Sequence, residues 1–492
     1  MGKQVLIVGA GVGGLCSALR LASKGYKVKI LEKNSQAGGR LNQLKKDGFT
    51  FDIGPSFFSM SYEFEELARD CNIVLPFEYQ ALDPLYSVHF HGNNTPFRLY
   101  KDIHRLAEQF KDIEPDFERK MKRYLDECKS VFDDTVDVVI KQNFDSLIHY
   151  IISLLRVHPK HLPKLMRTFW QELGRYFTSS EVQQILSLVS FFLGRTPFET
   201  PAVFTLLSYT EFVHDGYHNV KGGMYKIVEG FVDELNKMGV VIEYNTEIID
   251  FQSRNGKISA LIDANGRVHD SDVFLINADA AVFRGRVMRQ KSFDEHHLSK
   301  MKWTMGYLTF YLGLDTKLPQ VDHHNFYLGA DFKDYAEKIT QHPENLDNPY
   351  YYVNVLSKHN AECAPEGCEN LFFVCPVPSL QLKSDWSDRD KVVNGIIDDF
   401  SQRIGVDVAS HIISKTIYTP HEWAKMVNLQ YGSGLGLSHD LGQLGGFRPK
   451  NVDEKFCNLF YVGASTTPGA GIPMAVISSK LTCERIEEFS SV

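Results

Sequence analysis

The fold of this protein is decided near the N-terminus by the run VLIVGAGVGG, which covers residues 5–14. An amphipathic stretch follows, and a second short apolar run, KVKILE, covers residues 27–32. A β-branched run that enters a glycine turn, followed by a helix and a second strand, predicts a βαβ unit. The turn carries the dinucleotide-binding fingerprint G-x-G-x-x-G at Gly9, Gly11 and Gly14.

Each residue of this fingerprint has its own expected role. Gly9 permits a tight turn, Gly11 lets the backbone approach a pyrophosphate, and Gly14 lets the helix pack closely on the strand. The N-terminus of the helix adds free N–H groups and a partial positive charge for the phosphates. Glu32 follows about 20 residues later, where a carboxylate binds a ribose hydroxyl and repels a 2′-phosphate. The context therefore favours a nucleotide site over an ordinary glycine loop.

The fingerprint alone does not choose between a nicotinamide and a flavin cofactor, and two further glycine-rich stretches favour a flavin. Gly38-Gly39-Arg40 would bring bare backbone and a fixed charge beside the same cofactor. Near the C-terminus, a predicted strand at 459–462 leads into the run GASTTPGAGIP at 463–473 and then into a final helix that starts near Pro473. The positive end of that helix can stabilise the negative charge that a flavin gains on reduction.

Composition limits the other possibilities. The chain has 492 residues, a hydrophobic fraction of 43% and a net charge of −8. These values predict two or three globular domains and argue against a nucleic-acid partner. No apolar run approaches the roughly 18 residues that a spanning helix needs, and the first strand begins too early for a signal peptide. The eight cysteines are scattered and predict reduced thiols, so a cytoplasmic location is expected.

The pattern along the chain predicts an α/β protein with three parts. A Rossmann-like cofactor domain is assembled from residues 1–75, 215–282 and 421–492. A mixed-sheet substrate domain comprises residues 76–100 and 283–420, with aromatic-rich strands at 307–314, 350–356 and 371–376. A helical subdomain covers residues 101–214. Within the central cofactor segment, an antiparallel meander is expected from strands at 240–244, 247–252, 257–263 and 272–275.

The chain resembles a known family in several separated motifs. Arg40 and the run Phe51-Asp52-Ile53-Gly54-Pro55 resemble the extended FAD-binding motif of the amine oxidase and phytoene desaturase superfamily. The matches to bacterial-type carotenoid desaturases extend from end to end: Gly216, Gly222-Gly223-Met224, Asn277-Ala278-Asp279, the run YGSGLGL at 431–437, Gln443, Arg448-Pro449 and residues 463–473. Fingerprint and resemblance together predict FAD bound by Gly9, Gly11, Val12, Gly13, Gly14, Glu32, Lys33, Gly39, Arg40, Gly54, Pro55, Ser56, Ile248, Asp279, Gly463, Ile472, Pro473 and Met474.

The resemblance implies an enzyme that removes two hydrogens from a carbon–carbon bond beside a polyene, with FAD as hydride acceptor and a quinone or oxygen as final electron acceptor. The run PSFFSM at 55–60 is closer to the hydroxycarotenoid 3,4-desaturases, which act on a 1-hydroxycarotenoid. A multi-step phytoene desaturase that forms lycopene-type products remains an alternative. Thr467 stands where relatives often have a histidine. A prenyl-binding protein similar to Rab GDP-dissociation inhibitors is the non-enzyme alternative, and an amine oxidase is the other enzyme alternative.

No catalytic residue is predicted, because such a reaction mainly requires the reacting bond to be held against the flavin and water to be excluded. The polar residues that precede the central glycine pair are interpreted as ordinary loop and helix residues: Glu211, His214, Asp215 and His218. The adjacent pairs His296-His297 and His323-His324 are expected to be solvated surface side chains, and no metal site is predicted.

Residues 144–170 are predicted to touch a membrane and to border the mouth of the substrate tunnel, so the protein is expected to be a peripheral membrane protein. An apolar helical stripe comprises Phe144, Leu147, Ile148, Ile151, Ile152 and Leu155. A basic cluster follows at Arg156, Lys160, Lys164 and Arg167. A core-facing helix with a solvated basic end is the alternative.

Overall fold

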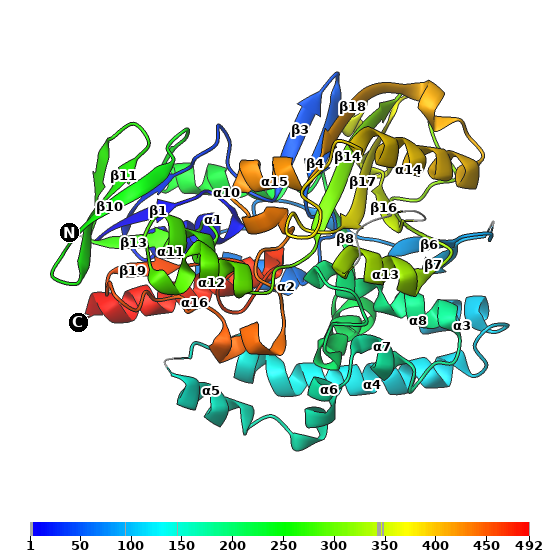
Figure 1. Ribbon diagram of the computed structural model, residues 1–492, viewed down its shortest axis with the longest axis horizontal. Helices are drawn as coiled ribbons and strands as arrows, with labels where there is room; N and C mark the ends of the chain where they lie inside the picture. The colour runs from blue at the N-terminus through cyan, green and yellow to red at the C-terminus, as the bar shows by residue number, and fades with distance from the viewer. Residues whose placement is uncertain (1–2, 94, 145, 342–345, 347–348, 492) are drawn as a thin grey trace.

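The structure is a computed structural model that describes residues 3–491 apart from 94, 145, 342–345 and 347–348. A parallel five-stranded sheet, in the order β19-β13-β1-β2-β9, lies at the left of Figure 1, near both chain ends. In that order its strands are Leu459–Tyr461, Val273–Ile276, Gln4–Val8, Lys27–Leu31 and Val241–Glu243. One sheet therefore joins strands from the beginning, middle and end of the chain.

Different elements pack against the two faces of this sheet. Val5 and Ile7 of β1 pack in one core with a layer of helices, whereas Leu6 and Val8 pack in another core on the opposite face. The helices of the first face are α1 (Val12–Ser23), α2 (Ser61–Asp70), α10 (Lys226–Lys237) and α16 (Ile472–Ser491). The opposite face carries β10 (Ile248–Arg254), β11 (Lys257–Asp263) and α11 (Ala280–Arg286). The alternation along β1 thus supports the predicted βαβ unit, which the parallel pairing of β1 and β2 around α1 confirms.

The predicted antiparallel meander was partly wrong. The strands expected at 240–244 and 272–275 are β9 and β13, and both pair in parallel within the five-stranded sheet. The antiparallel sheet consists of β10, β11 and the unpredicted β12 (Val268–Asp270). All four residues of β13 are buried, which is typical of a central parallel strand with both faces covered.

A mixed seven-stranded sheet stands at the upper right of Figure 1, in the order β18-β14-β17-β16-β15-β6-β7. In that order its strands are Ile412–Tyr418, Gly306–Leu314, Glu369–Val377, Tyr351–Asn354, His324–Leu328, Tyr86–Phe90 and Phe97–Leu99. Only the β15–β6 pair is parallel. Helices α13 (Phe332–Thr340) and α14 (Arg389–Ile404) pack in its core. The predicted mixed sheet and its three aromatic-rich strands are confirmed.

The stretch 101–214 is helical and lies along the bottom of Figure 1. Its α-helices are α3 (Ile103–Phe110), α4 (Phe117–Thr135), α5 (Leu147–Leu154), α6 (Leu162–Met166), α7 (Phe169–Leu173), α8 (Ser180–Ser187) and α9 (Leu206–Tyr209). Among the described residues, no helix has both the length and the apolar character needed to span a bilayer.

Smaller elements connect these parts. They are the strand pairs β3–β4 (Asn42–Lys46, Phe49–Ile53) and β5–β8 (Tyr79–Ala81, His218–Val220), and helices α12 (Glu295–Lys300) and α15 (Pro420–Val427). All eight cysteines are free thiols, as expected. The predicted domain boundaries remain predictions. Some residues of the predicted domains, and one residue of the predicted membrane segment, lie outside the described residues: 1, 2, 94, 145, 342–345, 347–348 and 492.

Candidate active site

A cavity of about 750 Å³ joins the two large sheets. Residues that follow β1, β2, β13 and β19 line one end, and side chains of β14, β16 and β17 line the other. The predicted cofactor residues that line it are Gly9, Gly11, Val12, Gly13, Glu32, Lys33, Gly39, Arg40, Gly54, Pro55, Ser56, Ile248, Asp279, Gly463, Ile472 and Pro473. Gly14 and Met474 are not on its wall. The structure thus brings three distant segments together, although contact of each residue with FAD stays a prediction.

The glycine turn leaves the start of α1 open to the cavity. Gly9 has φ +99°, a conformation that side chains rarely adopt. Gly11 caps α1 without any side-chain hydrogen bond, so the first N–H groups of the helix are available to a phosphate. Gly14 does not line the cavity but allows α1 to pack closely on the turn, since a Cβ there would lie 2.2 Å from the carbonyl oxygen of Gly9. The turn therefore requires glycine for packing at Gly14 and for helix access at Gly11.

Glu32 is buried at the end of β2, with 5% of its surface exposed. Its Oε2 accepts a hydrogen bond from the Ala10 N–H at 2.7 Å, and its Oε1 accepts one from the Asn34 N–H at 2.8 Å. The carboxylate therefore braces the glycine turn and also faces the cavity. Sequence reasoning predicted the second of these roles and missed the first.

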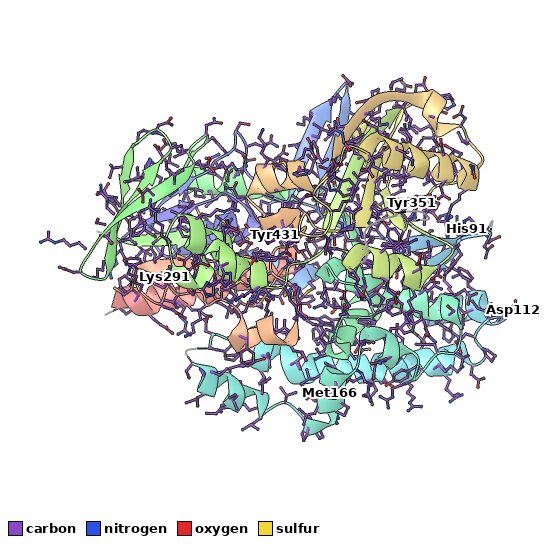
Figure 2. All side chains as sticks on the ribbon, viewed as in Figure 1. His91, Asp112, Met166, Lys291, Tyr351 and Tyr431 are labelled. Carbon is purple, nitrogen blue, oxygen red and sulfur yellow. The ribbon has the colours of Figure 1, made fainter. Side chains whose placement is uncertain are left out.

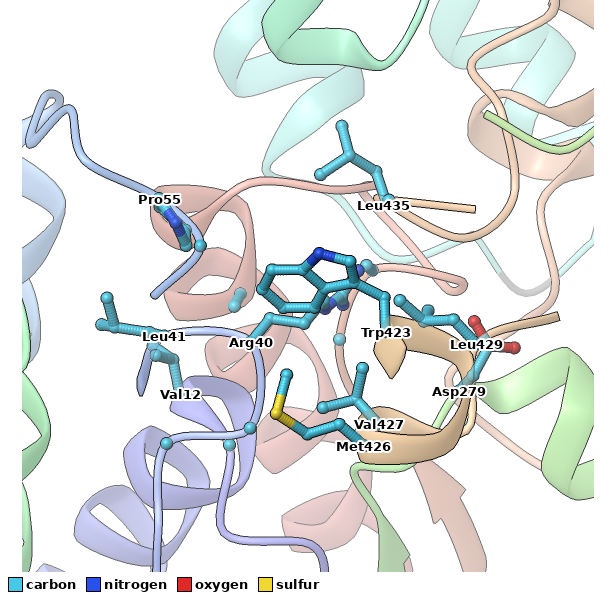
Figure 3. Close-up of a pocket in the computed structure, with 18 of the residues that line it drawn as sticks. Val12, Arg40, Leu41, Pro55, Asp279, Trp423, Met426, Val427, Leu429 and Leu435 are labelled. Atoms are coloured by element: carbon cyan, nitrogen blue, oxygen red, sulfur yellow. The ribbon is translucent and has the colours of Figure 1, made fainter. Parts of the chain in front are cut away.

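Arg40 carries a charge that the protein itself leaves without a partner. It lines the cavity near Trp423 (Figure 3) and makes no hydrogen bond or ion pair to any described residue. Burial lowers the pKa of the Arg40 guanidinium, and the carboxylate of Asp279 opposes that effect. Arg40 is half-buried and has Asp279 as one nearby negative charge, so its unused N–H donors can bind a further anionic group such as a phosphate.

The C-terminal glycine-rich loop is held by one buried arginine, Arg448. Its guanidinium donates to five backbone carbonyls, those of Leu437, Ser438, Gln443, Ala464 and Thr466. Burial lowers the pKa of Arg448 to about 10, so it stays charged at neutral pH. Helix α16 then begins at Ile472, which confirms the predicted start near Pro473 and turns its positive end toward the cavity.

These observations fit a dinucleotide flavin. The side-chain-free start of α1 and the unpartnered Arg40 suit a pyrophosphate, Glu32 suits a ribose, and the start of α16 suits the reducible ring. Residues 12–487 match the family described as flavin containing amine oxidoreductase. This protein belongs to that family.

Individual relatives agree with this assignment. A zeta-carotene-forming phytoene desaturase of Myxococcus xanthus is 31% identical over 495 residues, which cover 99% of this chain and 94% of the relative. A 4,4′-diapophytoene desaturase (4,4′-diaponeurosporene-forming) of Staphylococcus aureus is 30% identical, with 98% of each chain covered. Among solved structures, putrescine oxidase bound to putrescine has a TM-score of 0.65 at 15% identity, with 99% of each chain covered, and shares the fold. The protein is an FAD-dependent oxidoreductase.

The other end of the flavoenzyme's cavity is aromatic. Its wall includes Phe57, Phe191, Phe192, Tyr307, Phe326, Tyr350, Tyr351, Tyr352 and Phe372. Phe57 lies at the centre of this group, with ring centroids at 5.0 Å from Phe192, 6.0 Å from Phe326 and 5.3 Å from Tyr352. Such a wall is typical of a site for an apolar ligand.

Sequence reasoning missed helix α15, which covers the cavity between the two ends. Trp423, Met426 and Val427 line the wall beside Arg40 (Figure 3). The Trp423 indole N–H donates to Thr309 Oγ1 at 3.2 Å and so ties α15 to β14. Nothing in the local pattern of α15 distinguishes it from a surface helix, because its position depends on packing against a distant strand.

The four polar residues before the central glycine pair, Glu211, His214, Asp215 and His218, do not line the cavity. Asp215 accepts hydrogen bonds from the Ser61 N–H at 2.9 Å and its Oγ–H at 2.7 Å. Glu211 accepts one from the Tyr86 hydroxyl at 2.6 Å, and burial raises the pKa of its carboxyl to about 8. These contacts support the interpretation of ordinary structural polar residues.

The prediction for the second histidine pair was wrong. His323 and His324 are 8% and 1% exposed, because other rings cover them: His324 stacks on Phe57 at 4.0 Å and His323 lies 4.8 Å from His359. His296 and His297 are exposed on α12, as expected. Within the described part of the chain, no three histidine, cysteine or acidic side chains are grouped as metal ligands.

Proposed function

We propose that this flavoenzyme is a carotenoid desaturase that introduces a 3,4 double bond into a 1-hydroxycarotenoid in carotenoid biosynthesis. The observation that carries the proposal is the single cavity that joins the FAD site to an apolar, aromatic wall. The relatives that are named phytoene and diapophytoene desaturases support the same substrate class. The run at 55–60, of which Pro55, Ser56, Phe57 and Ser59 line the cavity, supports the hydroxycarotenoid branch over the phytoene branch.

The chemistry needs two hydrogens to leave neighbouring carbons, one as hydride and one as a proton. FAD, when bound, would accept the hydride and take up the released proton, and a quinone or oxygen would remove both hydrogens afterwards. The aromatic residues position the reacting bond and exclude water. No histidine of the described residues lines the cavity, and the conjugated chain itself spreads the positive charge that hydride loss creates.

We further propose that residues 144–170 rest on a membrane surface, from which a carotenoid enters. Ile148, Leu155 and Met166 are 70%, 79% and 85% exposed, and Figure 2 shows Met166 at the lower edge of the molecule. Arg156 and Lys160 are exposed beside them. This exposure argues against the alternative of a core-facing helix.

Two residues of the predicted basic cluster are not free to bind lipid. Lys164 is 4% exposed and donates to the buried Glu172 at 2.5 Å, and Arg167 Nε lies 2.8 Å from the same carboxylate. They form an internal ion-pair network with Arg175. The proposed lipid contact therefore rests on Arg156 and Lys160 together with the apolar side chains.

Expression in two carotenoid-producing hosts tests the desaturase proposal. In cells that make a 1-hydroxycarotenoid, we expect a product whose absorption bands move to longer wavelength, as one more conjugated double bond requires. In cells that make only phytoene, we expect no coloured product. Lycopene formed from phytoene would instead establish the phytoene branch.

The flavin content of the purified protein tests the non-enzyme alternative. A prenyl-binding protein without redox chemistry needs no flavin, whereas the proposed enzyme is expected to purify with FAD near one equivalent per chain and to show the yellow flavin spectrum. A colourless protein that binds isoprenoids and cannot be loaded with FAD would exclude the desaturase.

A further inference from the structure

A short chain of hydrogen bonds interrupts the aromatic wall close to the cofactor end of the cavity. Ser56 and Tyr352 both line the cavity, and the Ser56 hydroxyl lies 2.9 Å from the Tyr352 hydroxyl. The Tyr352 hydroxyl lies 2.5 Å from Nδ1 of His324, which is buried behind the wall and stacked on Phe57 at 4.0 Å. The desaturation chemistry does not require this chain. Ser56 is also a predicted FAD contact, but the hydrogen bond of its side chain runs to Tyr352 in the aromatic wall.

The direction of these hydrogen bonds follows from Asn354. Its side-chain N–H₂ donates to the His323 carbonyl at 3.2 Å and also lies 3.2 Å from His324 Nδ1. With the Asn354 N–H₂ facing it, Nδ1 carries the lone pair and accepts, and the His324 proton sits on Nε2, which has no hydrogen-bond partner among the described residues. The Tyr352 O–H must then donate to His324, which leaves its oxygen to accept from the Ser56 O–H. Each proton is thus donated within the chain of hydrogen bonds.

We infer that Ser56 Oγ, oriented by Tyr352 and His324, is a hydrogen-bond acceptor for a hydroxyl group of the substrate. Because the Ser56 proton is committed to Tyr352, the lone pairs of Oγ are what the cavity meets. They can bind an alcohol, which donates a hydrogen bond, but they cannot bind a ketone, which only accepts one. The inference rests on the proposed function and adds the residue that selects the substrate.

The position of Ser56 suits this role. In a 1-hydroxycarotenoid the hydroxyl is only a few bonds from the C3–C4 bond that reacts, so its binding group must lie close to the flavin. Ser56 directly follows Gly54 and Pro55, which line the cofactor end beside Arg40.

A role of this chain as a proton acceptor is less consistent with its surroundings. Burial, with smaller contributions from neighbouring His323 and His359, lowers the pKa of His324 well below its ordinary value. Burial raises the pKa of the Tyr352 hydroxyl. Both side chains therefore stay neutral at physiological pH, as a fixed hydrogen-bonding frame requires.

The test compares Ser56→Ala with the wild-type enzyme on two matched substrates, a 1-hydroxycarotenoid and the same carbon skeleton without the hydroxyl. We expect Ser56→Ala to lower the ratio of kcat/KM for the alcohol over that for the hydrocarbon about tenfold, as the loss of one buried hydrogen bond implies. Tyr352→Phe should lower the same ratio less, because Ser56 remains but is no longer oriented. Ser253→Ala is the control, since Ser253 is exposed on β10 and does not line the cavity; it should keep the ratio.

Equilibrium binding, followed by quenching of tryptophan fluorescence, gives a readout that does not depend on turnover. The alcohol should bind about tenfold more tightly than the hydrocarbon to the wild type and equally to Ser56→Ala, and a keto analogue should bind no better than the hydrocarbon. Equal loss for both ligands, a ratio unchanged by Ser56→Ala, or a ratio changed as much by Ser253→Ala would overturn the inference. Desaturation of neither substrate would overturn the proposed function, while the binding preference would still decide the role of Ser56.

Discussion

Single buried side chains hold together segments that are far apart in this sequence. Arg448 ties the loop at 437–443 to the loop that follows β19 through five carbonyls. Asp52 does the same for two cofactor segments, since it accepts the Met224 N–H at 2.8 Å and the Tyr225 N–H at 3.3 Å. The D-x-G-P motif therefore joins the first cofactor segment to the second.

The buried carboxyl of Glu211 is expected to make the stability of the folded protein depend on pH. Burial raises its pKa from 4.5 to about 8 in the folded protein, so between these values the folded state holds a proton that the unfolded state has lost. The free energy of unfolding should then fall as pH rises from about 4.5 to about 8, at roughly 1 kcal/mol per pH unit.

Glu211→Gln should remove this contribution, because glutamine can still accept the Tyr86 hydrogen bond but cannot ionise. The measurement is the urea midpoint of the variant and the wild type between pH 5 and 9. A difference between the two proteins that does not change with pH would contradict the assignment.

At the scale of one element, the first turn of helix α1 must satisfy two structural requirements. The side facing the cavity must leave its N–H groups free, and the side facing β1 must lie against the Gly9 carbonyl. A Cβ at Gly11 would meet only the end of the Asn277 side chain at 2.8 Å, whereas a Cβ at Gly14 would meet backbone at 2.2 Å. The two glycines should therefore fail in different ways.

We expect Gly11→Val to lose FAD while the protein keeps its fold, and Gly14→Ala to lose both FAD and several degrees of thermal stability. Flavin absorbance after gel filtration and the Tm of the apoprotein measure the two effects. Gly395→Ala in α14 is the control, because a Cβ there has open space; it should keep FAD and gain about 0.5–1 kcal/mol. Full flavin in Gly11→Val would refute the role assigned to the turn.

At the scale of the whole molecule, the proposed membrane surface is linked to the flavin site. Tyr150 of α5 packs against Gly445 and Gly446 and has its ring 5.8 Å from that of Phe447. Arg448 follows directly and holds the C-terminal loop that lines the cavity. The segment Gly445–Phe447 therefore lies between α5, which we propose to contact lipid, and the loop beside the cofactor.

Exchanging the exposed apolar side chains tests the membrane surface. Ile148→Glu with Leu155→Glu should reduce sedimentation with vesicles several-fold, because burial of apolar area in the interface is lost. Arg156→Glu with Lys160→Glu should reduce binding to anionic vesicles and not to neutral ones. Val74→Glu, at a side chain 87% exposed outside residues 144–170, should bind like the wild type; equal binding by all variants would exclude this surface.

Much of the cofactor half was predictable because its signals are local. The turn at Gly9, the acid at Glu32 and the start of α16 each depend on a few consecutive residues. The aromatic strand β14 was likewise found from its own composition. The placement of β9 and β13 was not, since strand pairing joins residues far apart in the chain and several pairings satisfy the same hydrophobic pattern.

From the sequence by itself we could predict the dinucleotide-binding turn, the motifs shared with the family, and FAD as the cofactor. Only the tertiary structure decided that Trp423 lines the cavity, that Lys164 belongs to a buried ion pair, and that His324, Tyr352 and Ser56 lie within hydrogen-bond distance of one another. Local backbone geometry follows from neighbouring residues, whereas burial and hydrogen-bond direction depend on which distant segments pack together. The βαβ turn thus identifies the cofactor, and the packing of β15 and β16 behind Ser56 shapes what can lie beside it.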